Sequence, residues 1–196
     1  MATKTTPSEN FGDELNKCLE VLANGGIIVY PTDTIWGIGC DATNAEAVSK
    51  IYALKKRANT KTMICLVSND FMLEQHIQKV PDVAYDIIDL ATKPTTIVYD
   101  HPKGVAKNLV AEDDTLAIRV ASDKFCQYLI QKLKKPLVST SANLAGEPIP
   151  TSFKEISPEI LKGVDYVVNL VRDKEKSTPS SIIKLGNDGI VKVIRE

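Results

Sequence analysis

The chain has 196 residues, of which 43% are hydrophobic, and a formal net charge of −1. This length and apolar content suit one globular domain with a sizeable core, so we expect residues 1–196 to form a single domain. The nearly neutral charge argues against a protein that coats nucleic acid with an overall basic surface, although a local basic patch could still bind RNA.

The first predicted elements are a helix and a short strand. Residues 13–24 place apolar side chains on one helical stripe, with Asp13 as a candidate cap at the start and Gly25 and Gly26 as a stop. Residues 26–30 are apolar and rich in β-branched side chains, which is typical of a strand buried on both faces of a sheet. Pro31 is expected to end the pairing of that strand.

A second helix is predicted after Asn44, which can cap its first turn. Its core-facing side chains recur at helical spacing: Ala47, Val48, Ile51 and Leu54. Lys55, Lys56 and Arg57 end this helix, and cations suit the negative end of the helix dipole.

The rest of the chain alternates between predicted strands and helices. Further strands are expected at residues 63–67, 95–99, 116–120, 137–140 and 166–170, and helices near residues 82–92 and 123–134. The closing sequence SSIIKLGNDGIVKVIRE predicts a hairpin that turns at Asn187, Asp188 and Gly189. This mixture, with its antiparallel end, indicates an α/β sheet of irregular topology rather than a regular doubly wound fold. Residues 172–177, RDKEKS, are expected to form a mobile charged connector.

Neither targeting signals nor metal-binding patterns are apparent. The start, MATKTTPSEN, lacks the apolar segment of a signal peptide, and no stretch approaches the length needed to cross a bilayer. We therefore expect a cytoplasmic protein with no membrane partner. The four cysteines lie far apart without Cys-x-x-Cys or Cys/His spacing, which predicts buried thiols and no metal site.

Two predicted strands run directly into hydroxyl-bearing segments. The sequence PTDT follows the first strand, and STSAN ends the strand that begins at residue 137. Because ligands bind at strand ends in α/β folds, we predict one cleft between the two segments. The alternative is two ordinary turns held by local hydrogen bonds. Ser141 and Asn143 could bind phosphate or ribose oxygens, and neither has a nearby His, so a serine nucleophile is not predicted.

Three cationic side chains are candidates for binding an anion. Lys55 and Arg57 could neutralise a triphosphate, or they could simply form a solvated basic helix end. Arg119 lies inside an apolar strand, where a guanidinium is costly unless it meets an ion-pair partner or an anionic ligand.

Six motifs occur in a set order between about Leu15 and Arg195: YPTDTIWGIGCDATN, LKKR, IRV, STSANLAGEPIP, PSSIIKL and VIRE. Together they resemble the YrdC/YciO-like domain of threonylcarbamoyl-AMP synthases. The resemblance implies an open, twisted, mixed sheet with flanking helices around a concave basic cavity. It also implies a nucleotidyltransferase that joins L-threonine, bicarbonate and ATP into L-threonylcarbamoyladenylate and releases pyrophosphate.

The resemblance also implies roles for individual residues. The implied catalytic residues match the K-x-R and S-x-N pairs of the family and also bind ATP: Lys55, Arg57, Ser141 and Asn143. The implied threonine-binding residues are Thr34, Arg119, Ser139 and Ser180. Further implied ATP contacts are Thr115, Arg195 and, through its backbone, Ile149.

The implied cofactors and partners follow from the same resemblance. ATP is a substrate, and Mg²⁺ is carried on its phosphates rather than by a protein metal site. The product serves the threonylcarbamoyl modification of tRNA, so tRNA and the tRNA-modification transfer proteins are the implied macromolecular partners.

The chain departs from the family pattern at two positions. Leu66 stands where the family has a His, and Trp36 stands where Tyr is usual. The alternative function is therefore a YciO-like protein that binds double-stranded RNA or tRNA without this catalysis.

Overall fold

The computed structural model describes residues 7–57, 63–170, 172 and 178–196. Within these residues one mixed sheet of nine strands runs through the molecule, in the order β7-β1-β2-β6-β3-β5-β4-β8-β9. The strands are β1 (Ile28–Tyr30), β2 (Gly37–Gly39), β3 (Ile64–Val67), β4 (Thr95–Asp100), β5 (Thr115–Val120), β6 (Leu137–Ser141), β7 (Tyr166–Val167), β8 (Ser181–Leu185) and β9 (Val191–Arg195). The helices are α1 (Pro7–Ala23), α2 (Ala45–Leu54), α3 (Asp70–His76), α4 (Val83–Leu90), α5 (Lys124–Leu133) and α6 (Pro158–Gly163), with short 3-10 turns η1 (Lys107–Leu109) and η2 (Phe153–Glu155).

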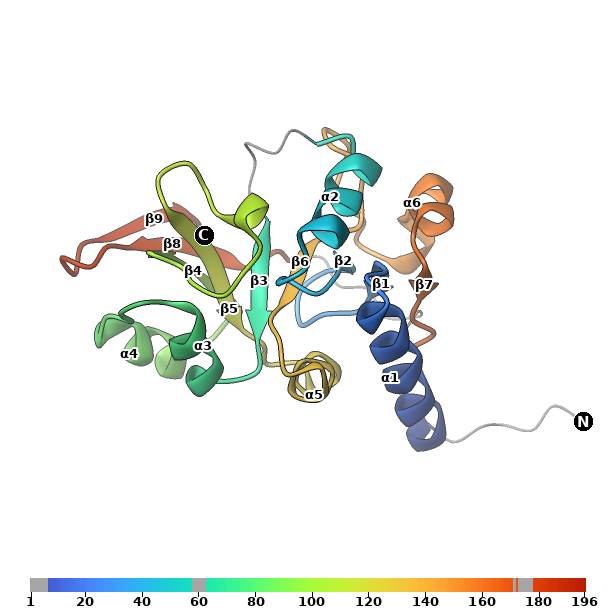
Figure 1. Ribbon diagram of the computed structural model, residues 1–196, viewed down its shortest axis with the longest axis horizontal. Helices are drawn as coiled ribbons and strands as arrows, with labels where there is room; N and C mark the ends of the chain where they lie inside the picture. The colour runs from blue at the N-terminus through green and yellow to red at the C-terminus, as the bar shows by residue number, and fades with distance from the viewer. Residues whose placement is uncertain (1–6, 58–62, 171, 173–177) are drawn as a thin grey trace, which may run out of the picture.

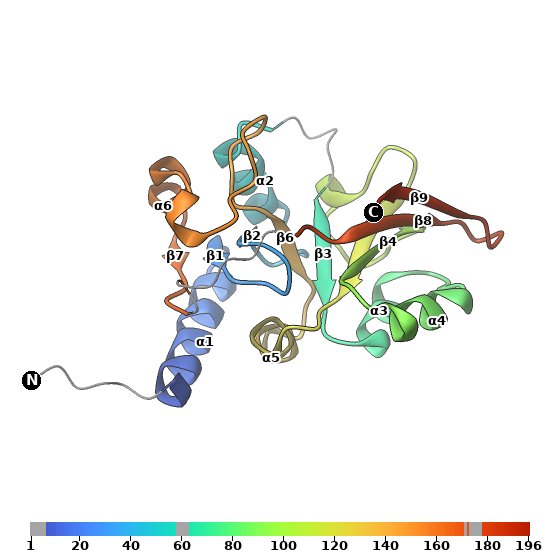
Figure 2. The ribbon, with the colours of Figure 1, turned by 180° about the vertical axis from the view of Figure 1, so that it is seen from behind.

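The helices flank the sheet, and the β8–β9 hairpin projects from one end of the molecule. Helix α1 packs on α5, β1 and β7, and α3 packs on β3 and β5. Helix α2 faces the viewer in Figure 1, whereas the view from behind brings β8 and the loop after β1 to the front (Figure 2). The predicted mixed α/β sheet with flanking helices is confirmed.

Strand β1 lies in the core, as its apolar sequence predicts. Ile28, Val29 and Tyr30 have no exposed surface. Strands β2 and β7 pair with the two edges of β1, and helix α1 packs on it. The small residues of β2 make room for this packing: a side chain at Gly39 would lie 2.7 Å from Cε1 of Tyr30 and would also meet the carbonyl oxygen of Val138.

The ends of α2 and of the hairpin follow the predicted local chemistry. The side chain of Asn44 accepts hydrogen bonds from the backbone N–H groups of Glu46 (3.0 Å) and Ala47 (3.1 Å), so it caps α2 as predicted. In the predicted hairpin, the N–H of Gly186 donates to the carbonyl of Ile190, and Gly189 adopts φ +81°.

Several elements differ from the prediction. Helix α1 begins at Pro7, so Asp13 lies inside it rather than capping it. The ring of Phe11 packs edge-on against Phe125 and Tyr128 of α5, and this tertiary contact holds the extra turn. Strand β7 ends at Val167 instead of residue 170, because its partner β1 is short and ends before Pro31. Strand β2 and helices α3 and α6 were not predicted.

The remaining predictions about the chain concern cysteines, membranes and the connector. All four cysteines are buried and free, which confirms the predicted buried thiols. Among the described helices, none combines the length and the apolar character that a membrane crossing requires. The predicted connector at residues 172–177 lies outside the described residues except for Arg172.

Candidate active site

A pocket forms where β2 pairs with β6. The register places Gly37 opposite Ser141, and it therefore brings the loop at residues 31–36 beside the end of β6. Thr34, Ser139 and Ser141 line this one pocket together with Gly37. The two hydroxyl-bearing segments that follow different strands thus share a cleft, as the sequence predicts.

The hydrogen bonds of the loop after β1 determine what Thr34 offers to the pocket. Oγ1 of Thr32 donates its proton to the carbonyl of Ile35 (2.7 Å) and lies 3.0 Å from Oγ1 of Thr34. A hydroxyl has one proton, so Thr34 is the donor in this pair. The hydroxyl of Thr34 also accepts a long bond (3.4 Å) from Nη2 of Arg119. Its oxygen therefore faces the pocket as an acceptor.

Arg119 reaches the pocket from β5 and has an ion-pair partner. Its Nη2 donates to Oδ1 of Asp33 at 2.8 Å, and both side chains are buried. Oδ2 of Asp33 accepts a hydrogen bond from Oγ of Ser122 at 2.9 Å. Of the two alternatives for Arg119, an ion pair or an anionic ligand, the structure shows the ion pair while leaving the guanidinium on the pocket wall.

Ser180 and Arg195 form a third part of the wall. Nε and Nη2 of Arg195 both donate to the carbonyl of Ser180, at 3.0 and 2.8 Å. The hydroxyl of Ser180 is 2.8 Å from Oγ1 of Thr96 on β4. The last strand of the sheet therefore supplies a fixed guanidinium to the pocket, and the residue before β8 supplies a hydroxyl.

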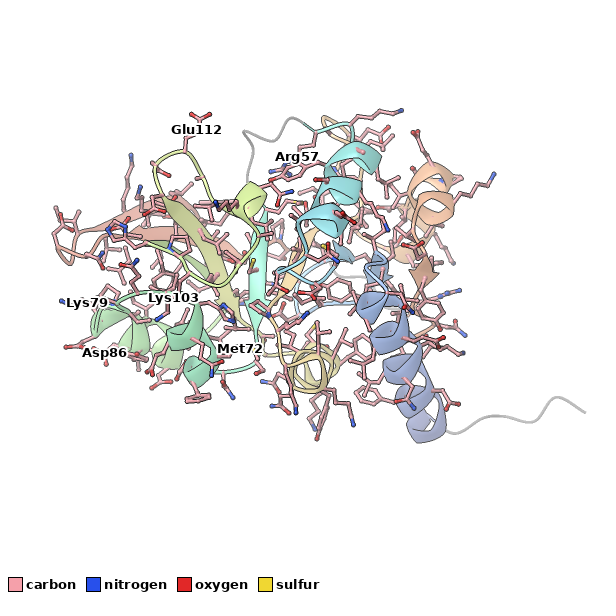
Figure 3. The ribbon with its side chains drawn as sticks, viewed as in Figure 1. Arg57, Met72, Lys79, Asp86, Lys103 and Glu112 are labelled. Carbon is pink, nitrogen blue, oxygen red and sulfur yellow. The ribbon has the colours of Figure 1, made fainter. Side chains whose placement is uncertain are left out.

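Lys55 and Arg57 behave differently although only one residue separates them. Arg57 extends from the end of α2 and lines the pocket (Figure 3). Lys55 is 1% exposed, and its ammonium donates to the carbonyls of Ser141 and Asn143 and to Oδ1 of Asn143. Burial, reinforced by the nearby charge of Arg57, lowers the pKa of Lys55 to about 7.

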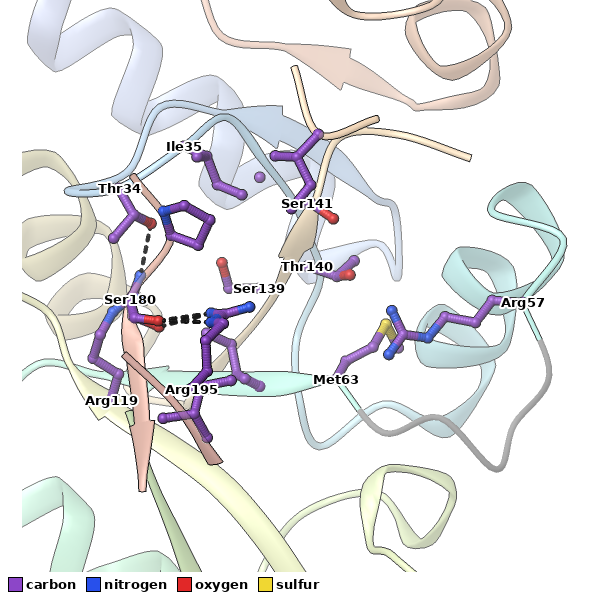
Figure 4. Close-up of a pocket in the computed structure, with 15 residues that line it drawn as sticks. Thr34, Ile35, Arg57, Met63, Arg119, Ser139, Thr140, Ser141, Ser180 and Arg195 are labelled. Atoms are coloured by element: carbon purple, nitrogen blue, oxygen red, sulfur yellow. Dashed lines mark hydrogen bonds between the residues drawn. The ribbon is translucent and has the colours of Figure 1, made fainter. Parts of the chain in front are cut away.

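The pocket is strongly positive. Arg57 lies on the side of α2, and Arg119 and Arg195 lie on the opposite side, with the hydroxyls of β6 between them (Figure 4). Burial lowers the pKa of Arg195, and the charge of Arg119 lowers it further, because the two guanidiniums repel each other. None of the described residues that line the pocket is acidic. Such a pocket favours an anionic ligand.

The structure brings together most, but not all, of the predicted site residues. The predicted residues on the pocket wall are Thr34, Arg57, Arg119, Ser139, Ser141, Ile149, Ser180 and Arg195. Lys55 and Asn143 lie behind the wall, where Nδ2 of Asn143 donates to the carbonyl of Glu147. Thr115 lies at the far end of β5 from Val120, and its hydroxyl donates to Asp113 rather than facing the described pocket.

Sequence reasoning missed part of the wall. Met63 and Ile64 line the pocket because Ile64 pairs with Ser139 across the sheet, a register that the sequence does not display. Asp33 was also missed as the partner of Arg119. Its position inside the PTDT motif was the available signal.

The described residues also bear on whether the protein itself could hold a metal ion. In the part of the chain that the structure describes, no three His, Cys, Asp or Glu side chains come together as metal ligands. The lining offers hydroxyls and guanidiniums instead, which suit the oxygens of an anion rather than a cation.

A mixed sheet whose strand ends surround a pocket lined by guanidiniums and hydroxyls defines an α/β protein with a site suited to small anions. The sequence profile of the Sua5/YciO/YrdC family, described as telomere recombination, matches residues 20–196. The Pseudoalteromonas translucida threonylcarbamoyl-AMP synthase is 35% identical over 151 residues, which cover 76% of this chain and 81% of that protein. A Methanocaldococcus jannaschii protein is 36% identical over 187 residues, which cover 92% of this chain and 86% of that protein. It is named provisionally as a threonylcarbamoyl-AMP synthase. The protein belongs to the Sua5/YciO/YrdC family.

Solved structures have the same fold. E. coli YciO superimposes with a TM-score of 0.79 at 26% identity, over 93% of this chain and 88% of YciO. P. abyssi Sua5 complexed with L-threonine superimposes with a TM-score of 0.78 at 23% identity, over 87% of this chain. This chain spans 50% of that Sua5 chain.

Proposed function

We propose that this protein is a threonylcarbamoyl-AMP synthase that joins L-threonine, bicarbonate and ATP and releases pyrophosphate. The observation that carries the proposal is a single pocket with the guanidiniums of Arg57, Arg119 and Arg195 and no acidic residue in its described lining. The reaction brings a carboxylate and a triphosphate into one place, and both need this positive charge. The names of the two relatives and the L-threonine bound to P. abyssi Sua5 support the same activity.

The side of the pocket around Arg119 suits the amino acid. The guanidinium of Arg119 would bind the threonine carboxylate, and the accepting oxygen of Thr34 would take a hydrogen bond from the substrate amine or hydroxyl. Ser139 and Ser180 add hydroxyls to the same region. These groups would hold the substrate in one orientation.

The side around Arg57 suits the nucleotide. Arg57 would bind the phosphates, with Arg195 across the pocket from it (Figure 4). Ser141 and Ile149 also line the pocket and would add contacts to the nucleotide, Ile149 through its backbone. Lys55 and Asn143 would contribute by holding the end of β6 in place. Mg²⁺ would arrive on the phosphates of ATP, because the described wall contains no carboxylate to bind it.

The chemistry needs positioning and neutralisation of charge more than acid or base catalysis. The threonine nitrogen bonds to the carbon of bicarbonate-derived carbon dioxide and loses a proton, which gives a carbamate. A carbamate oxygen then attacks the α-phosphorus of ATP, the bond to the β-phosphate oxygen breaks, and pyrophosphate leaves. The arginines would stabilise the negative charge that develops on the phosphates during this step.

The assay is pyrophosphate release by the pure protein with ATP, Mg²⁺, bicarbonate and one amino acid at a time. We expect release with L-threonine and little with L-valine, which has the same shape without the hydroxyl. Mass spectrometry should detect threonylcarbamoyl-adenylate in the same mixture. Arg57→Met serves as a control with strongly reduced activity. ATP binding without threonine-dependent turnover would contradict the proposal.

The second candidate is RNA binding by a YciO-like protein, and the guanidiniums of the pocket, which could contact RNA phosphates, are the observation behind it. The comparisons favour the synthase, since both curated relatives carry that name. RNA binding would appear as affinity for tRNA or double-stranded RNA that falls steeply with salt. The proposed synthase would also contact tRNA or tRNA-modification transfer proteins, which pull-down experiments test. It would be located in the cytoplasm, which cell fractionation tests.

A further inference from the structure

We propose that Asp33 is a positioning residue that orients the guanidinium of Arg119 toward the carboxylate of the amino-acid substrate. This inference rests on the proposed function. It assigns to Asp33 and Ser122 roles that the pocket lining alone does not suggest, because neither of them lines the pocket.

The first observation is that Asp33 is the ion-pair partner of Arg119 within the described residues. The side chains of Arg119 and Asp33 are 3% and 7% exposed, and their atoms meet at 2.8 Å. An ion pair between two buried side chains fixes the position of the guanidinium, and removing one member of such a pair leaves an uncompensated charge. Asp33 therefore determines where the head of Arg119 lies.

The second observation is that the Asp33 carboxylate is divided between two partners. Oδ1 accepts from Arg119, whereas Oδ2 accepts from the hydroxyl of Ser122 (2.9 Å) and from its backbone N–H (3.4 Å). Because Ser122 holds Oδ2, the carboxylate engages one nitrogen of the guanidinium instead of forming a two-bond fork with it. Some donors of Arg119 therefore stay available.

The third observation concerns another donor of Arg119. Nε of Arg119 is buried and has no hydrogen-bond partner among the described residues, so it is neither accessible to a ligand nor an anchor of the side chain. The bond from Nη2 to Asp33 is the charged contact that fixes the guanidinium. Because Arg119 lines the pocket, the position that Asp33 gives it is the position that a substrate carboxylate would meet.

The decisive variant is Asp33→Asn, which keeps the shape of the side chain and removes its charge. We expect the KM for L-threonine to rise roughly 10- to 100-fold, since small misplacements of binding groups carry losses of this size. The KM for ATP should change by less than about threefold. Isothermal titration with L-threonine should show the same loss of affinity. Ser122→Ala removes the shorter of the two hydrogen bonds to Oδ2 of Asp33 and should raise the threonine KM by a smaller factor, about threefold or more.

Glu14→Gln is the matched control. Glu14 is 2% exposed and accepts hydrogen bonds from the Tyr166 hydroxyl and the Asn169 N–H, both at 2.7 Å, on α1 and away from the pocket. Glu14→Gln makes the same chemical change in a carboxylate that is even more buried, so it should lower the melting temperature without altering the threonine KM. This comparison separates a positioning role from a general loss of stability.

Each outcome has a defined meaning. If wild type is active and Asp33→Asn has an unchanged threonine KM and affinity, the positioning role is wrong while the proposed function stands. If Asp33→Asn lowers kcat alone, the role is also wrong. If Asp33→Asn does not fold, Ser122→Ala decides by the same criterion. If wild type neither binds L-threonine nor releases pyrophosphate, the proposed function fails, and this inference fails with it.

Discussion

Replacing Lys55 with Met should damage the fold and the activity together, whereas replacing Arg57 with Met should damage the activity alone. The ammonium of Lys55 is the donor for three oxygens of Ser141 and Asn143. Each hydrogen bond from a charged donor contributes about 1.5–3 kcal/mol. Burial disfavours the charged form of Lys55, as its pKa of about 7 shows, and Met avoids this cost, so only part of the sum is lost. We expect Lys55→Met to lower the free energy of unfolding by about 2–4 kcal/mol.

Arg57→Met tests the other half of the comparison. Arg57 is only partly buried, so we expect its loss to lower the free energy of unfolding by less than about 1 kcal/mol. Its effect on threonine-dependent pyrophosphate release should be about 30- to 1000-fold, which corresponds to about 2–4 kcal/mol of transition-state stabilisation. Urea denaturation and the pyrophosphate assay measure both quantities. A Lys55→Met protein as stable as wild type but inactive would refute the reasoning, because Lys55 would then act on the ligand directly.

Three further predictions address the pH dependence of stability, the packing of β2 and the loop at residues 31–36. Folding lowers the pKa of Lys55 to about 7, so above that pH the unfolded chain binds more protons than the folded chain. The free energy of unfolding of wild type should therefore rise with pH relative to that of Lys55→Met. Urea titrations at pH 6.5, 7.5 and 8.5 should show this difference in free energy growing by at most about 1.4 kcal/mol per pH unit. Gly39→Ala should lower the free energy of unfolding by about 1–3 kcal/mol, because the added methyl meets the ring of Tyr30; an unchanged urea midpoint would contradict the packing described here. Thr32→Val removes the acceptor for the Thr34 proton, so titration with L-threonine should show about 3- to 30-fold weaker binding, and equal affinity would count against this assignment of donor and acceptor.

Local chemistry explains which elements could be predicted. Asn44 caps α2, and the glycines of the last hairpin adopt the turn that their sequence suggests, because each depends on neighbours in the chain. Strand β2 was missed because it is only three residues long and contains two glycines. Its conformation is imposed by β1 and β6 on either side.

Some residues of the site could likewise be identified from the sequence, and others could not. The hydroxyl segments and Arg119 could be identified because polar residues inside or after apolar strands are conspicuous. The sequence could not show that Lys55 and Arg57 take different positions. Helix α2 ends at Leu54, and the turn that follows directs Lys55 into the interior and Arg57 to the pocket. The Asp33–Arg119 pair spans 86 positions, and only the three-dimensional structure brings its members together.

The order of strands also has a consequence for biosynthesis. Strand β1 pairs with β7, and β4 pairs with β8. The strands that are synthesised first therefore complete their pairing only after the later strands have been synthesised. Arg195, on β9, then completes the pocket wall. A nascent chain on the ribosome cannot assemble this pocket before β9 emerges, and pairing between strands far apart in the sequence favours slow folding. A ligand of the pocket therefore cannot stabilise the earliest steps of folding, during which one edge of β1 and one edge of β4 stay unpaired.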